Sequence, residues 1–317
     1  MTATLDRQPV SLEPVPMPER WHRPLLALAV GMTALAVVCG VLALVDPREI
    51  LGQNAWFKPL KFAVSIAIYA VTLAWLIGQL RRWQRAAAVA GTIVVIALVA
   101  EIVIIVWAAA AGTTSHFNVT TPLNTTLWSI MASSIAVVWI VTLLIGIALF
   151  VSPTPDAARN LAIRAGVVLG LAGMAVAFLM TGPNADQLDD FQGIAGAHAV
   201  GVPDGGAGLP FLGWSTEGGD LRVPHFVGMH ALQVLPLTLL ALELLSRRVP
   251  VLRDVRVRWR IMLVVSLAFA AVLGILTWQA LIGQPVIAPA GPVLIALVGV
   301  LVAAPVAAVA VVAGARR

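Results

Sequence analysis

The chain has 317 residues, of which 60% are hydrophobic and 11% are charged, and it carries a net charge of +5. Apolar runs of about 20 residues recur along its whole length, and each is long enough to cross the hydrocarbon core of a bilayer, which is about 30 Å thick. These runs exclude a soluble domain. They also exclude nucleic acid as a partner, because the arginines lie in short loops between the runs, where they orient a membrane protein.

The apolar runs predict an all-α bundle of eight transmembrane helices. A polar leader over residues 1–24 precedes a single transmembrane domain over residues 25–317. Cys39 is the single cysteine and lies inside the first run, so an internal disulfide is excluded. The expected spans lie near residues 25–45, 58–79, 86–110, 127–150, 160–180, 224–246, 259–282 and 291–314.

Three arginine-rich connections fall on the same side of this predicted bundle. They are residues 81–85, residues 153–164 and residues 247–260, and the last of these holds six arginines. Because cytoplasmic loops carry an excess of lysine and arginine, this side is expected to face the cytoplasm. An even number of spans then puts both termini in the cytoplasm.

The longest connection, residues 181–223, is expected on the opposite, outer side. Ten of its 43 residues are glycine, and aromatic residues that include Trp214 are interspersed among them. Glycine allows tight turns and close packing, and the aromatic rings provide surface to bury. We therefore expect an ordered lid over the outer mouth of the bundle. The alternative is an exposed, unstructured loop.

Glu101 is the strongest single signal in the sequence. It lies in the third apolar run, in Ala-Leu-Val-Ala-Glu-Ile-Val-Ile-Ile, without a polar neighbour. A carboxylate inside a membrane costs several kcal/mol unless it is protonated or paired, and such residues are often functional. Its partner must come from another span, and Lys61 and His230 are the candidates. The alternative is a structural tie between helices.

Polar groups from several spans are expected at one depth in the outer half of the membrane. With a rise of about 1.5 Å per residue, His230, Gln233 and Glu101 lie roughly 9–14 Å below the outer ends of their spans. Few polar residues lie in the inner half apart from Glu243. We expect Glu101, His230 and Lys61 as catalytic groups. The candidate substrate-binding residues are Gln233, Trp214, Asn118 and Gln279.

Four of the five histidines fall on the expected outer side. His225 and His230 are five residues apart, so on a regular helix they diverge by about 140° and cannot grip one ion without help from other segments. Imidazole and carboxylate groups suit zinc and similar divalent metals. The metal ligands expected from several elements are His116, His225, His230 and Asp220. The alternative is that these histidines form hydrogen bonds with the lid.

Four short strings resemble those of an uncharacterised bacterial family of multi-pass membrane proteins. They are Asn-Ala-Trp-Phe-Lys-Pro-Leu-Lys-Phe at 54–62, Ser-His-Phe-Asn at 115–118, Asp-Gly-Gly-Ala-Gly-Leu-Pro at 204–210, and His-Phe-Val-Gly-Met-His-Ala-Leu-Gln at 225–233. The resemblance implies a location in a bacterial cytoplasmic membrane, and it implies no particular activity.

A looser chemical likeness is to the alkaline ceramidase and adiponectin-receptor superfamily of membrane-embedded zinc hydrolases. Those proteins use a serine and a histidine early, an aspartate midway and a paired histidine late, an order that is similar to Ser115, His116, Asp220, His225 and His230. They have seven spans and a four-residue histidine spacing. The present chain departs from both features.

Three classes of function follow from these residues. The leading hypothesis is a membrane enzyme with an outward-facing polar pocket, which uses a divalent metal on a lipid-like or small apolar substrate. The second is a redox protein that binds haem b or a quinone, with Glu101 as the proton acceptor. The third is a proton- or cation-coupled carrier, which the nearly apolar inner half disfavours. A purely structural membrane protein is a further alternative.

Overall fold

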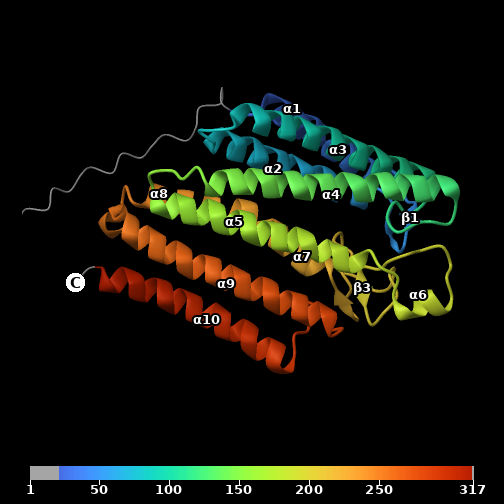
Figure 1. The fold of residues 1–317 in the computed structure, drawn as a ribbon. Helices are drawn as coiled ribbons and strands as arrows, with labels where there is room; N and C mark the ends of the chain where they lie inside the picture. Colours follow the sequence, from blue (N-terminus) through green and yellow to red (C-terminus); the bar gives the residue numbers. More distant parts are fainter. Residues whose placement is uncertain (1–20, 316–317) are drawn as a thin grey trace, which may run out of the picture.

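The computed structural model describes residues 21–315, so most of the expected leader lies outside the described residues. Helices dominate this part of the chain (Figure 1). The long helices are α1 (Arg23–Val45), α2 (Phe57–Gln79), α3 (Gln84–Ala111), α4 (Pro122–Phe150), α5 (Ala157–Ala175), α8 (Ala231–Leu245), α9 (Val255–Leu281) and α10 (Gly291–Gly314).

The short elements connect the long helices. They are the 3₁₀ helices η2 (Val176–Met180) and η3 (Pro250–Arg253), the helices α6 (Ala185–Asp189) and α7 (Arg222–Met229), and the strands β1 (Glu49–Ile50), β2 (Gln53–Asn54), β3 (Ala199–Val200) and β4 (Gly219–Asp220). β1 pairs with β2, and β3 pairs with β4, both in antiparallel orientation.

The helix lengths confirm an all-α bundle of multi-pass membrane type. Among the described residues, seven helices are long and apolar enough to cross a membrane, and the bent pair α7 and α8 makes an eighth span if it is counted as one. α4 begins at Pro122 rather than near residue 127, because the Thr121 side chain accepts a hydrogen bond from the Asn124 amide and caps the helix. Large apolar side chains face outwards, as Leu44 at 86% exposure and Ile295 at 73% illustrate, and such a surface is typical of contact with lipid.

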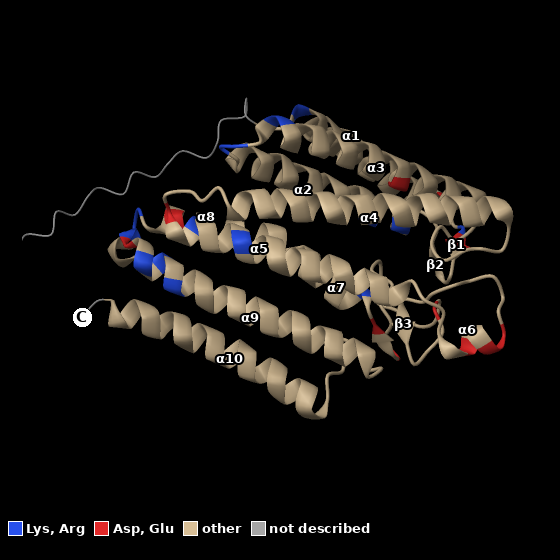
Figure 2. Ribbon diagram, viewed as in Figure 1, with Lys and Arg blue, Asp and Glu red and all other residues tan. Residues whose placement is uncertain are grey.

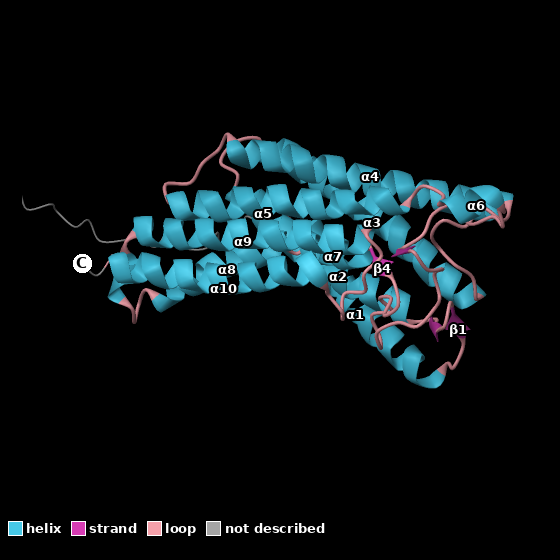
Figure 3. Cartoon of the chain, turned by 90° about the horizontal axis from the view of Figure 1, so that it is seen from below, coloured by secondary structure: helices cyan, strands magenta, loops and turns pink. Residues whose placement is uncertain are grey.

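The helices form two neighbouring groups (Figure 1). α1 packs on α2, and α2, α3 and α4 continue the first group. In the second group α5 contacts α7, α8 and α9, while α10 lies against α9. The strands and the long loops gather at one end of the bundle, which we call the loop end (Figure 3).

Charged residues are distributed unequally between the two ends of the bundle (Figure 2). Most arginines gather at the end opposite the loop end, which we call the arginine-rich end, whereas Lys58 and Lys61 lie at the start of α2 at the loop end. At the arginine-rich end, Arg159 contacts Glu243 at 2.8 Å and Arg258 contacts Asp156 at 2.8 Å, and both pairs join different helices of the second group. The acidic residues of the loop end lie mostly near β1, β3 and α6, while α3 carries a single acidic residue inside its apolar length.

The helix pair α7 and α8 is bent at the loop end. α7 and α8 meet at His230 with a bend of 41°. α7 also approaches α5 so closely that a Cβ at Gly173 would overlap the backbone of Gly228, which requires glycine at both positions. The break and the close approach together position His225 and His230 at the inner edge of the loop end.

The loop over residues 181–221, called the long loop below, packs onto the helix ends. The Ala195 amide donates to the Phe117 carbonyl at 2.8 Å, and the Val119 amide donates to the long loop at 2.8 Å. The Lys61 ammonium of α2 donates to the carbonyls of Phe211 and Leu212, both at 2.9 Å. These contacts order the segment in contact with α2 and with the connection between α3 and α4.

Candidate functional site

Glu101 lies near the loop end of α3 and is the centre of the candidate site. Its exposure is 1%, and neither carboxyl oxygen has a hydrogen-bond partner within the described residues. The nearest ionisable nitrogen is Nε2 of His116, which lies 3.8 Å from Oε1. That distance is too long for a hydrogen bond. A buried polar group without a partner destabilises the fold by about 1–3 kcal/mol, which makes Glu101 a candidate for a role other than stability.

His116 reaches Glu101 from the connection between α3 and α4. Its Nδ1 lies 3.0 Å from the hydroxyl of Ser115, which leaves Nε2 turned towards the carboxyl group. The imidazole is enclosed by the rings of Phe62, Phe117 and Trp128, whose centroids lie 5.6, 6.0 and 5.6 Å away. Burial lowers the pKa of His116 well below its ordinary value of 6.5, and the positive charge of Lys58 adds to this shift. The ring is therefore neutral at neutral pH.

Phe117 holds a strained backbone beside this histidine. Its φ of 61° lies in the left-handed region, which costs a residue with a side chain about 1–3 kcal/mol. The buried Phe117 ring packs against Trp128 and His198, and its carbonyl accepts the amide of Ala195. The contacts with the long loop hold this conformation, so the loop and the position of His116 are coupled.

Charged groups of the long loop and of α2 complete the surroundings. Lys58 lies within electrostatic range of Glu101 and of Arg222. The Asp204 carboxylate accepts hydrogen bonds from the amides of His198 and Ala199 and lies 2.6 Å from Nδ1 of His198. Burial alone would raise the pKa of Asp204, but these hydrogen bonds hold it well below its ordinary value. Asp204 is therefore a carboxylate that orients the His198 ring.

No family model matches the chain, and neither a curated protein nor a solved structure matches it. The resemblances drawn from its short strings remain predictions. The chemistry of the site is therefore derived from its own residues.

The expected metal ligands do not converge. In the part of the chain that the structure describes, no three histidine, cysteine, aspartate or glutamate side chains are grouped so that they could hold one ion. Asp220 accepts hydrogen bonds from Arg222 and from the Ser215 amide. His225 donates from Nδ1 to the Gly173 carbonyl at 2.9 Å. The expectation of a site made by His116, His225, His230 and Asp220 is not supported, because local hydrogen bonds occupy two of these side chains and turn them to different partners.

Lys61 and His230, the expected partners of Glu101, make other contacts. Lys61 binds the two carbonyls of the long loop. His230 lies 3.2 Å from the amide oxygen of Gln233, whose nitrogen donates to Thr72 at 3.0 Å. The predicted contact between His230 and Glu101 is absent from the described residues, where Glu101 has His116 as its neighbour and His230 is linked through Gln233 to Thr72 of α2.

The remaining expected binding residues mostly serve the architecture. Asn118 is 5% exposed and forms hydrogen bonds within its own loop, for example with Thr120. Gln279 donates to the Pro285 carbonyl, although its buried Oε1 has no partner within the described residues. Trp214 packs against the Phe226 ring with centroids 6.3 Å apart. Their role in binding a substrate remains a prediction.

Three groups near the site had weak signals in the sequence. Lys58 follows the aromatic pair at the start of α2 and can be taken for an interfacial anchor. His198 and Asp204 lie six residues apart in a glycine-rich segment, and no periodic pattern indicates that they meet. An aspartate before two glycines, which favours a turn, is the only cue that Asp204 bonds backbone amides.

Proposed function

We propose that this protein is a membrane enzyme that uses Glu101 and His116 for general acid–base catalysis on the polar head of a lipid-like substrate. A carboxyl group and a neutral imidazole 3.8 Å apart form a pair in which one group accepts a proton and the other donates one. Such pairs are often too far apart without substrate and tighten when it binds. The observation that carries the proposal is the complete burial of Glu101 without a hydrogen-bond partner among the described residues.

We also propose an orientation for the protein in the membrane. The arginine-rich end faces the cytoplasm, in agreement with the positive-inside tendency, and both termini lie there. The site and the long loop then face the outside, and the long loop acts as the lid. Together with the family resemblance, this orientation supports a location in the bacterial cytoplasmic membrane.

The test is lipid turnover by the purified protein in vesicles made from a total bacterial lipid extract. Lipid species are quantified by mass spectrometry before and after incubation. We expect turnover by the wild type, and its loss in Glu101→Gln and in His116→Asn. Tyr69→Phe is the control, because Tyr69 is buried in α2 and its hydroxyl bonds to Thr142 at 2.6 Å, away from the candidate site. Equal turnover in all four proteins would refute the proposal.

A quinone is the second candidate substrate, and one observation favours it. The three aromatic rings around His116 form walls that suit a flat ring. In this case the carboxyl group of Glu101 would form a hydrogen bond with a ring oxygen of the bound quinone. Organic extraction of the purified protein followed by absorption spectroscopy distinguishes the two candidates, because a bound quinone has an ultraviolet band that a saturated lipid lacks.

A further inference from the structure

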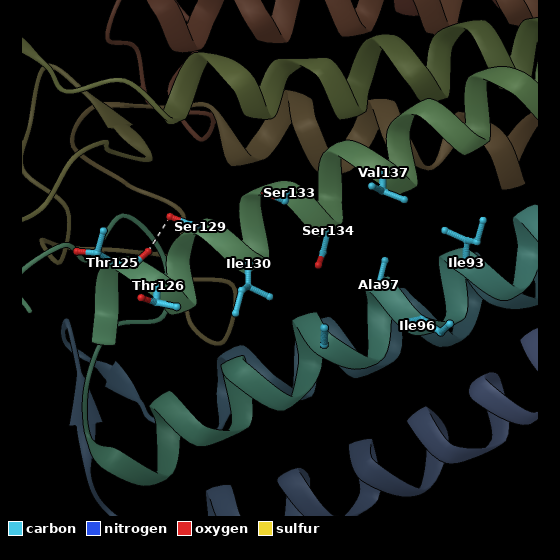
Figure 4. A pocket seen from close by; sticks show the side chains of 11 residues that line it. Ile93, Ile96, Ala97, Thr125, Thr126, Ser129, Ile130, Ser133, Ser134 and Val137 are labelled. Atoms are coloured by element: carbon cyan, nitrogen blue, oxygen red, sulfur yellow. Dashed lines mark hydrogen bonds between the residues drawn. The ribbon is translucent and has the colours of Figure 1, made fainter. Parts of the chain in front are cut away.

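A groove runs along the surface of the bundle between α3 and α4, parallel to these helices (Figure 4). Its volume is about 650 Å³, within the range of about 300–1,000 Å³ typical of sites for small ligands. Ile93 and Ala97 of α3 face Ile130 and Ser134 of α4 across it. Ile93 is 44% exposed and Ile130 is 43% exposed, so the groove opens to the surface that contacts lipid.

The length of the groove matches one leaflet. Its lining residues on α4 extend from Thr125 to Val137, a rise of about 18 Å, against a hydrocarbon core of about 30 Å. It begins within the first turn of α4, at the loop end. A hydrocarbon tail needs only one leaflet.

The hydroxyl groups at the loop end of the groove are already satisfied. Thr125 donates to Thr121 at 2.9 Å, Thr126 donates to Pro122 at 2.8 Å, and Ser129 donates to Thr125 at 2.8 Å. These bonds return to the backbone of α4 itself. Helices that associate in membranes through such residues use the hydroxyls across the interface. Ser133 and Ser134 add two hydroxyl groups to the wall, but isoleucine, alanine and valine side chains provide most of the rest, and these suit hydrocarbon.

The groove borders the candidate site. Ala97 and Ala100 line it, and Glu101 follows Ala100 directly and lies one turn, about 6 Å, beyond Ala97. On α4, Ser129 lines the groove, while the neighbouring Trp128 contacts His116. The same turns of the two helices thus form a wall of the groove and a wall of the site.

The charge near the site favours an anionic head. Lys58 lies within electrostatic range of two further cations, Lys61 and Arg222. Arg222 is paired with Asp220, but both lysines are without a carboxylate at contact distance among the described residues. Glu101 and Asp204 also lie within electrostatic range of Lys58, but neither touches it. An anion such as a carboxylate or a phosphate would give the two lysines the direct contact with an opposite charge that they lack.

We propose that the groove holds the hydrocarbon tail of a single-chain anionic lipid whose head meets Glu101 and His116. The inference rests on the proposed function, since it names the class of substrate for the same site. It also predicts binding that can be measured without turnover.

The test uses palmitic acid with a photoreactive diazirine halfway along its chain, added to the protein in vesicles. After illumination, labelled peptides are located by mass spectrometry. We expect saturable labelling concentrated on α3 and α4, and its reduction to the level of the other helices in Ser134→Phe, which fills the groove. Ala132→Phe adds the same ring to an exposed position of α4 outside the groove, and should leave labelling unchanged. Ser134→Leu, a smaller change, should give a partial loss if Ser134→Phe fails to fold.

Two results would overturn the inference. One is labelling spread evenly over all lipid-facing helices and insensitive to Ser134→Phe. The other is a cross-link that joins the α4 helices of two copies, which would show that a second copy of the protein occupies the groove. Failure of the proposed function can be distinguished from failure of this inference. If only the proposed function is wrong, the groove is still labelled but Glu101→Gln retains full lipid turnover.

Discussion

Replacement of Glu101 by leucine is expected to stabilise the fold while it abolishes the proposed activity. Both carboxyl oxygens are buried without hydrogen bonds within the described residues, and His116 at 3.8 Å is too distant to be a lost hydrogen bond. Removing an unsatisfied buried polar group recovers about 1–3 kcal/mol. We therefore expect the free energy of unfolding of Glu101→Leu to rise by about 1–3 kcal/mol.

Glu243→Leu is the matched control, because Glu243 is also a buried glutamate in a transmembrane helix. Its carboxylate accepts hydrogen bonds from Arg159 at 2.8 and 3.1 Å. Loss of one partner of a buried ion pair costs about 3–5 kcal/mol, so this variant should be clearly destabilised. Unfolding of both variants and of the wild type is followed in the same detergent by circular dichroism. If Glu101→Leu loses as much stability as Glu243→Leu, Glu101 is a structural tie and the reasoning fails.

Three further predictions concern the histidine, the long loop and the helix crossing. Because burial lowers the pKa of His116 in the folded state, the unfolded chain binds a proton at this residue more readily than the folded chain does. The contribution of His116 to the free energy of unfolding is therefore fully present above pH 6.5 and is lost as the pH falls through the folded pKa. In His116→Phe, the melting temperature should depend less on pH over that range. Asp204→Asn weakens the hold on two backbone amides, so hydrogen exchange in the long loop should accelerate, and unchanged exchange would contradict this contact. Gly173→Ala places a methyl group against the backbone of Gly228 and should destabilise the protein by about 1–3 kcal/mol, whereas Gly274→Ala, with open space around it, should be nearly neutral in thermal unfolding.

The helices were predictable because the bilayer imposes a simple rule on the sequence. A span must satisfy its backbone internally and expose apolar side chains, so runs of about 20 apolar residues give the helices almost directly. The boundaries that shifted depended on local chemistry. α4 begins earlier because Thr121 is its cap. α7 and α8 separate at His230, inside residues 224–246, which were expected to form one continuous helix.

Two residues of the candidate site were expected from the sequence, but their contact with each other was not. Glu101 is conspicuous because it is isolated in an apolar run, and His116 was among the expected residues. Their approach depends on how the connection between α3 and α4 turns back into the bundle, with Phe117 at a positive φ. No periodicity encodes that turn. The same limit applies to His230, which contacts Gln233 rather than Glu101 and lies where α7 and α8 meet at a bend of 41°.

The most direct test of the proposed chemistry is infrared difference spectroscopy of the protein in vesicles, before and after addition of a single-chain lipid with a phosphate head, which adds no carboxyl band of its own. We predict a change in the carboxyl stretching band that is absent in Glu101→Gln and altered in His116→Asn. That result would show that Glu101 responds to the lipid head and that His116 shares in the response. A carboxyl band that is identical with and without bound lipid would contradict the assignment of Glu101 as the acid–base group of the site.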